Sequence, residues 1–321
     1  MRVRVAALAI AVLAVACGSN DDGREGWQDL EPDEVPTITP APRRLFGELL
    51  YGDDAWFGRL GPTLGGYLEA LEAPALVAPD ELIRSHFDSV SFGVTEGFGT
   101  PLGGSIRYGY PAAGGRSVGE MMFATSPLGS LTCGDGEATE VRGLPGCVRN
   151  GLAEHRYWTL RWEEAGVLFS VAVNDRVAED LGFESVREIV EASIVIDHRP
   201  VSFPLLPFDP DGTMTLALQG GVLRIEGACV YVHPTPRPPI LVLLPAGYTY
   251  LSADGSSLWV LGHVVSDGEH VAIGGHGKEP VFDDPEWEWS LSTFDLVQPW
   301  ADECVARDLW LVNSMSSTEV R

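Results

Sequence analysis

The sequence predicts an α+β region, an antiparallel sheet with a packing helix, followed by an all-β region that forms a small barrel or sandwich. Residues 44–200 contain successive strand-like segments and then an amphipathic helix, an order typical of α+β proteins. Residues 213–314 contain short apolar segments separated by Gly-containing turns, without a convincing amphipathic helix, which favours an all-β fold. The length of 321 residues agrees with two domains, which we expect to fold independently.

The composition excludes some functions. The chain carries 46 acidic and 21 basic residues, a net charge of -25, and Lys278 is its only lysine. Binding to nucleic acid through a basic face needs clustered lysine and arginine, so no nucleic-acid partner is expected. Because 45% of the residues are hydrophobic, most of the chain can bury a core.

The amino terminus has the pattern of an export signal. Arg2 and Arg4 precede an unbroken apolar run over residues 5–16, which is shorter than the roughly 20 residues of a membrane-spanning helix. The run ends in small residues at Cys17. This pattern resembles a bacterial lipoprotein signal, which implies cleavage after residue 16 and acylation (palmitate or a similar chain) at Cys17. The alternative is a plain signal peptide with a spare cysteine.

The resemblance implies a protein anchored by lipid to the cell membrane on its extracytoplasmic face, since two acyl chains suffice for stable anchoring. Residues 17–43 follow as a tether. Residues 18–43 hold seven acids and four prolines, and such a composition is expected to remain solvated and extended. Residues 315–321 are expected to be a flexible tail.

The first region begins with two predicted helices, at 67–73 and 79–87, the second of which opens with acidic residues that suit a helix dipole. A helix is also predicted at 183–193, where Val186, Ile189, Val190 and Ser193 share one face. Strands are predicted at 89–95, 105–110, 120–124, 157–162, 167–173 and 194–196.

A hairpin over 162–166, an apolar strand and a helix ending in Ala192-Ser193-Ile194 make up part of this region. Over residues 147–196 this arrangement resembles a domain of exported sporulation and anti-sigma-type lipoproteins. The resemblance implies the fold and no particular chemistry.

The second region follows a turn-rich boundary at 208–212. Strands are predicted at 214–218, 222–226, 229–233, 240–244, 258–261, 270–273 and 309–312. The segments Gly227-Ala228-Cys229-Val230-Tyr231 and Gly274-Gly275, with the late Cys304, resemble a small disulfide-stapled β-barrel domain of exported actinobacterial-type proteins, which also implies no known activity.

If Cys17 carries lipid, four cysteines remain, and an even number in an exported protein indicates disulfides. The four residues allow three pairings. Pairing Cys133 with Cys147 and Cys229 with Cys304 keeps each bond within one region and is favoured. A catalytic thiol is disfavoured because acidic neighbours of Cys133 would leave less thiolate.

The histidines offer the one hypothesis for a metal site. On strands joined by a turn at 266–268, His263 and His270 could face each other near Glu269 and His276. Exposed hairpin histidines are the commoner case, and the spacings match neither HExxH nor a zinc ribbon, so no metal and no cofactor is expected. The acidic pairs at 209–211 and 283–284 lack the spacing of a calcium loop.

Two further patterns contain candidate catalytic or binding residues. Ser117 lies in a G-x-S-x-G sequence, but a Gly/Pro-rich loop precedes it where an α/β-hydrolase has a strand. In a strand, Trp287 and Trp289 would share one face, suited to stacking on sugar rings, and Glu286 and Glu288 the other. Packing of the tryptophans and solvation of the glutamates is the simpler interpretation.

The sequence therefore favours a non-catalytic, surface-anchored lipoprotein that binds or senses an extracytoplasmic ligand or partner, such as an envelope protein or a glycan. The alternative is an extracytoplasmic hydrolase or carbohydrate-binding protein of the cell envelope. The residues that would serve such a hydrolase are Ser117, Glu286 and Glu288.

Overall fold

The computed structural model consists mostly of antiparallel β-sheets with few helices, as the sequence predicts. The structure describes residues 43–51, 56–97, 100–111, 119–127, 129–151, 157–199, 201–207, 217–278, 304 and 308–317. Residues 41–321 belong to one compact unit. For description we divide it into an N-terminal region, residues 43–199, and a C-terminal region, residues 201–317.

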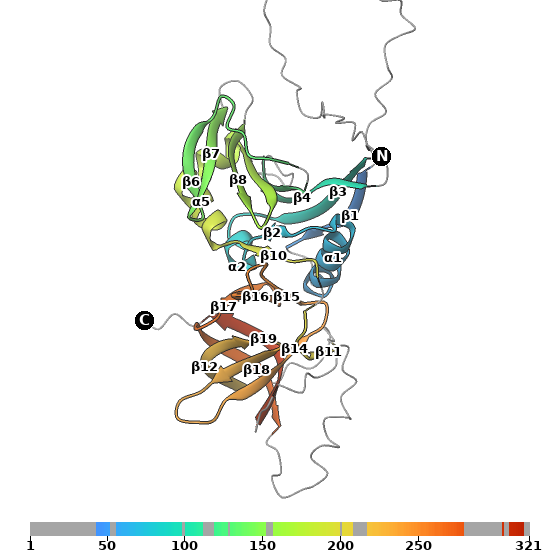
Figure 1. Ribbon diagram of the computed structural model, residues 1–321, viewed down its shortest axis with the longest axis vertical. Coiled ribbons are helices and arrows are strands. Elements are labelled where there is room, and N and C mark those ends of the chain that lie inside the picture. Colours follow the sequence, from blue (N-terminus) through green and yellow to red (C-terminus); the bar gives the residue numbers. More distant parts are fainter. Residues whose placement is uncertain are drawn as a thin grey trace, which may run out of the picture. The chain divides into compact units, whose positions relative to one another are not determined.

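The N-terminal region contains an eight-stranded sheet of order β1-β3-β4-β5-β9-β8-β7-β6, in which every neighbouring pair is antiparallel (Figure 1). Its strands are β1 (Arg43–Leu50), β3 (Ser89–Gly97), β4 (Thr100–Tyr110), β5 (Gly119–Ser126), β6 (Glu137–Val141), β7 (Leu144–Gly151), β8 (Tyr157–Glu164) and β9 (Val167–Asn174).

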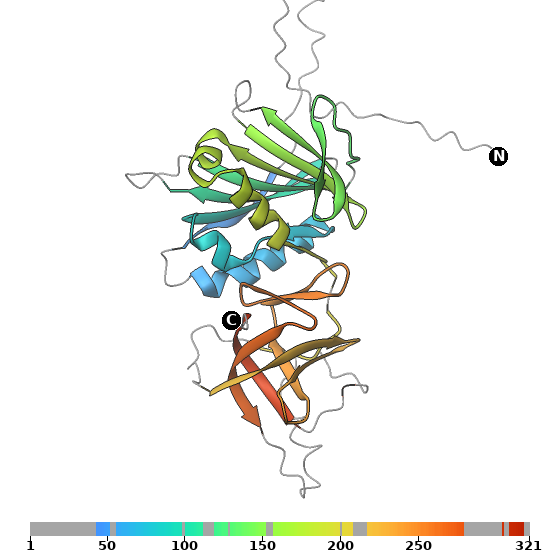
Figure 2. The ribbon, with the colours of Figure 1, turned by 90° about the vertical axis from the view of Figure 1, so that its left-hand side faces the viewer.

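One face of this sheet is covered by helices and a small second sheet. The covering elements are α1 (Trp56–Leu71), β2 (Ala75–Val77), α2 (Asp80–Arg84), α4 (Asp175–Leu181), α5 (Phe183–Ala192) and β10 (Ile194–Ile196), of which β2 and β10 pair with each other. Figure 2 shows α5 lying across the strands. Val186, Ile189 and Val190 of α5 are buried, which confirms the helical face that the sequence predicts.

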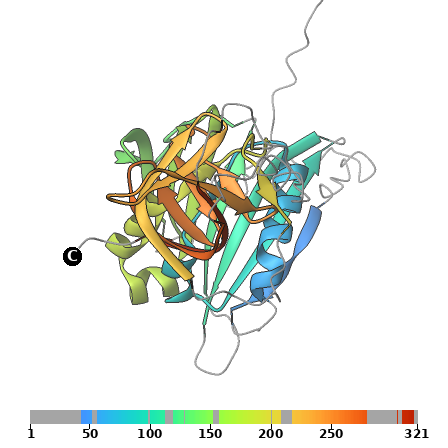
Figure 3. The same ribbon diagram turned by 90° about the horizontal axis from the view of Figure 1, so that it is seen from below.

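The C-terminal region contains two sheets. A three-stranded sheet is formed by β15 (Thr249–Leu251), β16 (Ser257–Val260) and β17 (His263–Ser266). The other sheet has the order β11-β14-β13-β12-β18-β19, and β19 also pairs with β14, in parallel, so the pairing returns to a strand already in the sheet (Figure 3). Its strands are β11 (Leu205–Leu206), β12 (Ala217–Glu226), β13 (Cys229–His233), β14 (Ile240–Pro245), β18 (His270–Lys278) and β19 (Asp308–Ser317).

Several boundaries differ from the predicted ones. Arg43 belongs to β1 rather than to the tether, and β19 continues through Ser317, into the predicted tail. Helix α1 begins eleven residues before the predicted helix at 67–73, and α2 ends at Arg84, before residue 87. The segments predicted at 214–218 and 222–226 contribute to one strand, β12, which passes through Gly220 and Gly221.

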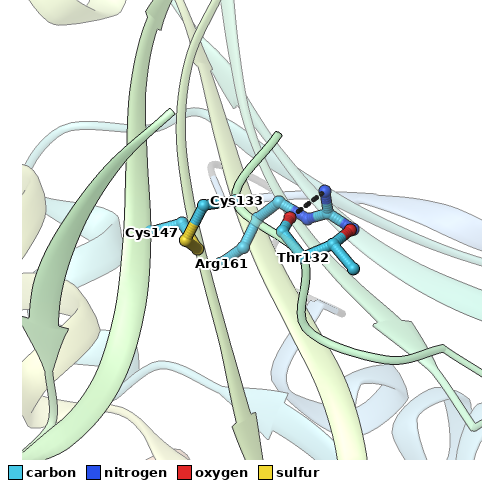
Figure 4. Close-up of a disulfide and its surroundings, with 4 residues drawn as sticks. All are labelled: Thr132, Cys133, Cys147 and Arg161. Carbon is cyan, nitrogen blue, oxygen red and sulfur yellow. Dashed lines mark hydrogen bonds between the residues drawn. A yellow bond between two sulfur atoms is a disulfide. The ribbon is translucent and has the colours of Figure 1, made fainter. Parts of the chain in front are cut away.

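The structure contains the two disulfide bonds that the sequence favours, Cys133–Cys147 and Cys229–Cys304. Figure 4 shows the first, which joins the segment before β6 to β7 next to Arg161 of β8. The Arg161 guanidinium donates a hydrogen bond to the Thr132 carbonyl at 3.4 Å.

Arg142 connects three elements of the N-terminal region. It occupies the turn between β6 and β7, with a left-handed φ of 54°. Its guanidinium donates to the carbonyl oxygens of Val190, Glu191 and Ser193 at the end of α5, and to the Glu164 carboxylate at 2.9 Å. Only 15% of the Arg142 side chain is exposed. The β6–β7 turn is thereby fixed to α5 and to the β8–β9 hairpin.

The two regions meet where two tyrosines of the C-terminal region contact α1. Pro62 lies inside α1 and has no N–H to donate to the carbonyl four residues earlier, that of Gly58. The Tyr248 hydroxyl donates to that carbonyl instead. The Tyr250 hydroxyl donates to the Gly61 carbonyl at 3.0 Å. A side chain from the C-terminal region thus replaces the hydrogen bond that Pro62 removes.

Glycines in α1 permit this close approach. A Cβ at Gly61 would lie 2.4 Å from the Gly247 carbonyl oxygen and 2.5 Å from the Tyr248 ring, and a Cβ at Gly65 would lie 2.8 Å from the Tyr250 hydroxyl. Both distances at Gly61 are too short for a real side chain.

We predict that Arg142→Ala lowers the free energy of unfolding by about 2–4 kcal/mol, because partly buried carbonyl oxygens and a carboxylate lose their donor. Urea denaturation measures this loss. The matched control is Arg149→Ala, which removes an exposed ion pair with Asp135 and should change stability by less than about 1 kcal/mol. Equal losses in both variants would contradict the role of Arg142.

We predict that Tyr248→Phe costs about 1–3 kcal/mol, because the Gly58 carbonyl is left without a donor. The cost should fall in a Pro62→Ala background, where residue 62 regains an amide that can donate to Gly58. A double-mutant cycle of unfolding free energies measures this coupling. Tyr250→Phe is the control. The Gly61 carbonyl, which accepts from the Tyr250 hydroxyl, keeps its helical donor whether residue 62 is proline or alanine. Equal coupling of both tyrosines to residue 62 would refute the explanation.

We predict opposite effects for two glycines of the same helix. Gly61→Ala should destabilise the chain by about 1–3 kcal/mol, because the methyl group would collide with the backbone at Gly247. Gly66→Ala places its methyl group 3.4 Å from the Phe46 ring and should be neutral or stabilise α1 by up to about 1 kcal/mol. Thermal unfolding of both variants compares them directly. A Gly61→Ala protein as stable as the wild type would show that the two regions are not in this close contact.

Candidate functional site

The candidate site is the contact between α2 of the N-terminal region and the β16–β17 turn of the C-terminal region. We call it the Asp80 corner, and it consists of Asp80, Glu81 and Arg84 of α2 with Gly262 and His263. The Asp80 amide donates to the Gly262 carbonyl at 2.9 Å. The Glu81 carboxylate lies 3.1 Å from Nδ1 of His263. Residues far apart in the sequence therefore form one small cluster of titratable groups.

Local sequence explains how α2 positions these side chains. Pro79 has an extended backbone and starts the helix, which places Asp80 and Glu81 in its first turn, where acidic residues suit the helix dipole. Arg84 follows Asp80 by one helical turn, and the two side chains form an ion pair at 2.6 Å. Ile83 is buried and fixes the short helix against the core.

Asp80 is the most strongly shifted carboxylic acid among the residues that the structure describes. Its side chain is 13% exposed. Burial raises the pKa of Asp80 from 3.8 to about 7, and the charges of Arg84 and His263 only partly oppose this rise. A carboxyl group with this pKa is protonated in a substantial fraction of molecules near neutral pH.

Glu81 shifts in the other direction. Burial alone would raise the pKa of Glu81. The hydrogen bond from His263, a backbone hydrogen bond and the charge of His263 together outweigh burial and hold the pKa below its usual range. The Glu81–His263 contact is ionic whenever His263 carries its second proton. The two neighbouring carboxyl groups of α2 are therefore poised to be in different protonation states.

A small cavity lies beside the corner. Its volume is about 20 Å³, room for roughly one water molecule. The lining residues are Tyr51, Leu60, Leu64, Val77, Ala78, Asp80, Ile83, Val90, Phe92, Tyr108 and Trp259. The indole Nε1 of Trp259 is buried without a hydrogen-bond partner. Burial raises the pKa of the Tyr51 and Tyr108 hydroxyls, which consequently remain neutral.

The chemistry open to this cluster follows from its dimensions. A cavity of about 20 Å³ has room for roughly one water molecule and none for an organic substrate, so the chemistry open to Asp80 within this cavity is proton exchange with water. The cluster combines a protonatable buried carboxyl group with the contact between two regions. That combination suits a response to protons.

The structure does not bring His263 and His270 onto paired strands, the arrangement that a metal site between them would need. His263 lies on β17, which pairs with β16, whereas His270 starts β18, which pairs with β12 and β19. The strands on either side of the 266–268 turn therefore belong to different sheets, and His263 contacts Glu81 instead. In the described part of the chain, no group of three or more His, Cys, Asp or Glu side chains gathers at a distance suited to a metal ion.

Other residues singled out in the sequence lie outside the described residues. They are Cys17 with the rest of the leader and tether, Ser117, the acidic pairs at 209–211 and 283–284, and Glu286, Trp287, Glu288 and Trp289. No helix in the described ranges is both long and apolar enough for a membrane span.

Sequence reasoning missed Asp80 and Glu81 as site residues. Their acidic charge at the start of a helix is visible in the sequence, but it also has the ordinary explanation of dipole stabilisation. The partner contacts at Gly262 and His263 come from a different sheet, and no local pattern indicates them.

Comparison with known proteins gives no relative from which to transfer a function. No protein-family model matches the chain, and neither a curated protein nor a solved structure matches it.

Proposed function

We propose that this chain is a non-catalytic protein, anchored by a lipid at Cys17 to the extracytoplasmic face of a bacterial cell membrane, which binds or senses a partner or condition outside that membrane. The observation that carries the proposal is the pair of disulfide bonds, Cys133–Cys147 and Cys229–Cys304. Disulfides persist in oxidising compartments and are rare in the cytosol, so they support export. The apolar run that ends at Cys17 supports the same location.

The non-catalytic part of the proposal is supported by the Asp80 corner. The buried carboxyl group there adjoins a cavity with room for roughly one water molecule, which favours a conformational role over turnover of a substrate. A binding partner would be a protein or glycan of the cell envelope. The high negative charge disfavours nucleic acid and anionic lipid as partners.

The finer fold class belongs to the same proposal. We infer that the N-terminal region is an α+β domain and that the C-terminal region is built on a small barrel. The circular pairing β14-β13-β12-β18-β19-β14 supports the barrel. The buried apolar residues of that region, Leu223, Val230, Val242 and Ile273 among them, support a core of its own.

We predict that Cys17 is acylated. Cells that express the full chain and grow with an alkyne-tagged fatty acid should incorporate the tag into the wild type and not into Cys17→Ala. Ser19→Ala, a change in the same segment that leaves the cysteine in place, should incorporate the tag like the wild type. Equal labelling of wild type and Cys17→Ala would contradict the lipid anchor.

The non-catalytic part has its own test. The purified chain should release neither reducing sugar from peptidoglycan nor alcohol from a short-chain ester. A hydrolytic activity that disappears in Ser117→Ala or Glu286→Gln would replace this proposal with the alternative of an envelope hydrolase.

A further inference from the structure

We propose that the Asp80 corner is a proton-controlled latch, which holds the β16–β17 turn against α2 when Asp80 is protonated and releases it when Asp80 ionises. The inference does not depend on the lipid anchor, since it rests on contacts within residues 43–317. It adds a conformational response to protons, which the proposed function does not specify.

The first argument is the geometry of the contact. Gly262 has a left-handed φ of 90°, and a Cβ built on it would lie 3.1 Å from the Asp80 Cβ. The Asp80 side chain is therefore covered directly by the backbone of the β16–β17 turn. Because the Asp80 amide also donates to the Gly262 carbonyl, separating α2 from this turn would expose the carboxyl group to water.

The second argument is the set of charged and titratable groups that face Asp80. Arg84 and Glu81 lie on α2 itself, and Arg84 contacts the Asp80 carboxylate at 2.6 Å. His263 lies on β17, Tyr108 on β4 and Tyr51 just after β1. Burial has the largest effect and favours the neutral acid, as does the charge of Glu81, whereas Arg84 and His263 oppose it.

The third argument is the sign of the linkage. Because the pKa of Asp80 is higher in the closed state, about 7, than the ordinary 3.8, its contribution to closing is complete in acid and is lost as the pH rises through about 7. Glu81 acts oppositely, since its pKa is lowered and its contact with His263 is lost in strong acid. The latch is therefore most stable at about pH 4, weakens progressively as the pH rises from there to about 7, and changes little above that pH.

Opening has a defined structural consequence. Trp259 of β16 and Tyr108 of β4 line the cavity beside Asp80, and both are buried in the closed state. Release of the turn exposes this apolar surface between the two regions.

The experiment is hydrogen exchange of the full chain, followed by mass spectrometry of the peptides that contain α2 and the β16–β17 turn. Each exchange rate is divided by the intrinsic rate at the same pH, which gives the opening constant. If opening restores an ordinary pKa to Asp80, this constant rises about tenfold between about pH 6 and about pH 8. Peptides from the β8–β9 hairpin should show no such rise.

Substitutions separate the latch from a general loss of stability. In Asp80→Asn, a neutral analogue of the protonated acid, the tenfold rise of the opening constant between these pH values should be lost. Asp135→Asn, which alters an exposed aspartate elsewhere, should keep the tenfold rise. Arg84→Gln removes a charge that lowers the pKa of Asp80 and should move the rise to higher pH.

A pH-independent opening constant in the wild type would overturn the proposal, as would a tenfold rise that persists in Asp80→Asn. If Asp80→Asn does not fold, the test rests on Arg84→Gln and on the direction in which this variant shifts the pH of the rise in the opening constant. A shift to higher pH supports titration of Asp80, and an unchanged or lower midpoint overturns it.

Discussion

The need to bury one face of the eight-stranded sheet governs the arrangement of the remaining elements. An exposed apolar face of that extent would be costly, so the chain covers it with α1 and α2 before the sheet is complete and with α4, α5 and β10 after it. The same core includes Trp259 from β16 of the C-terminal region. Residues of both regions therefore cover the N-terminal sheet. Independent folding of residues 213–314 remains a prediction, and a fragment that folds alone would have to tolerate an exposed Trp259.

Much of the fold could be predicted from the sequence because its signals are local. The hairpin of β8 and β9 follows from two strand-like segments joined by a short Gly-containing loop, and the face of α5 follows from helical spacing. Both occur where predicted. Helix α1 was predicted only in part, because Gly61, Pro62 and Gly65 indicate an interrupted helix when their environment is unknown. The structure supplies the missing information, since tyrosines of another region replace the lost hydrogen bond and occupy the space beside the glycines.

Two other omissions have simpler causes. Helix α4 begins at Asp175, and the side chain of its N-cap residue Asn174 accepts a hydrogen bond from the Val177 amide. The sequence Asn174-Asp175 carries this local signal, but the helix that follows it is short. The β6–β7 hairpin lies in a segment rich in glycine and proline, and its turn residue Arg142 adopts a backbone conformation that arginine seldom takes. Contacts of Arg142 with α5 offset that strain, and they depend on residues about fifty positions away.

The candidate site could not be predicted, because its function depends on how two sheets meet. The sequence places Asp80 at a helix start and His263 in a hairpin, and each has an ordinary explanation there. The arrangement in which His263 and His270 face each other, which the sequence favours less than exposed hairpin histidines, does not occur for the same reason, since a turn between two strands does not require that they pair. Long-range packing determines which carboxyl group becomes buried, and the pKa follows from that burial.

The bond between Cys229 and Cys304 has a consequence for how the chain responds to proteases. It joins the start of β13 to a residue that follows the stretch 279–303, and β18 and β19, on either side of that stretch, are themselves paired. A single cut anywhere between Lys278 and Cys304 would therefore yield two fragments that stay covalently joined in an oxidising medium. Such a nick would leave the carboxyl-terminal fragment bound to the rest of the chain, and only a reductant would allow it to dissociate.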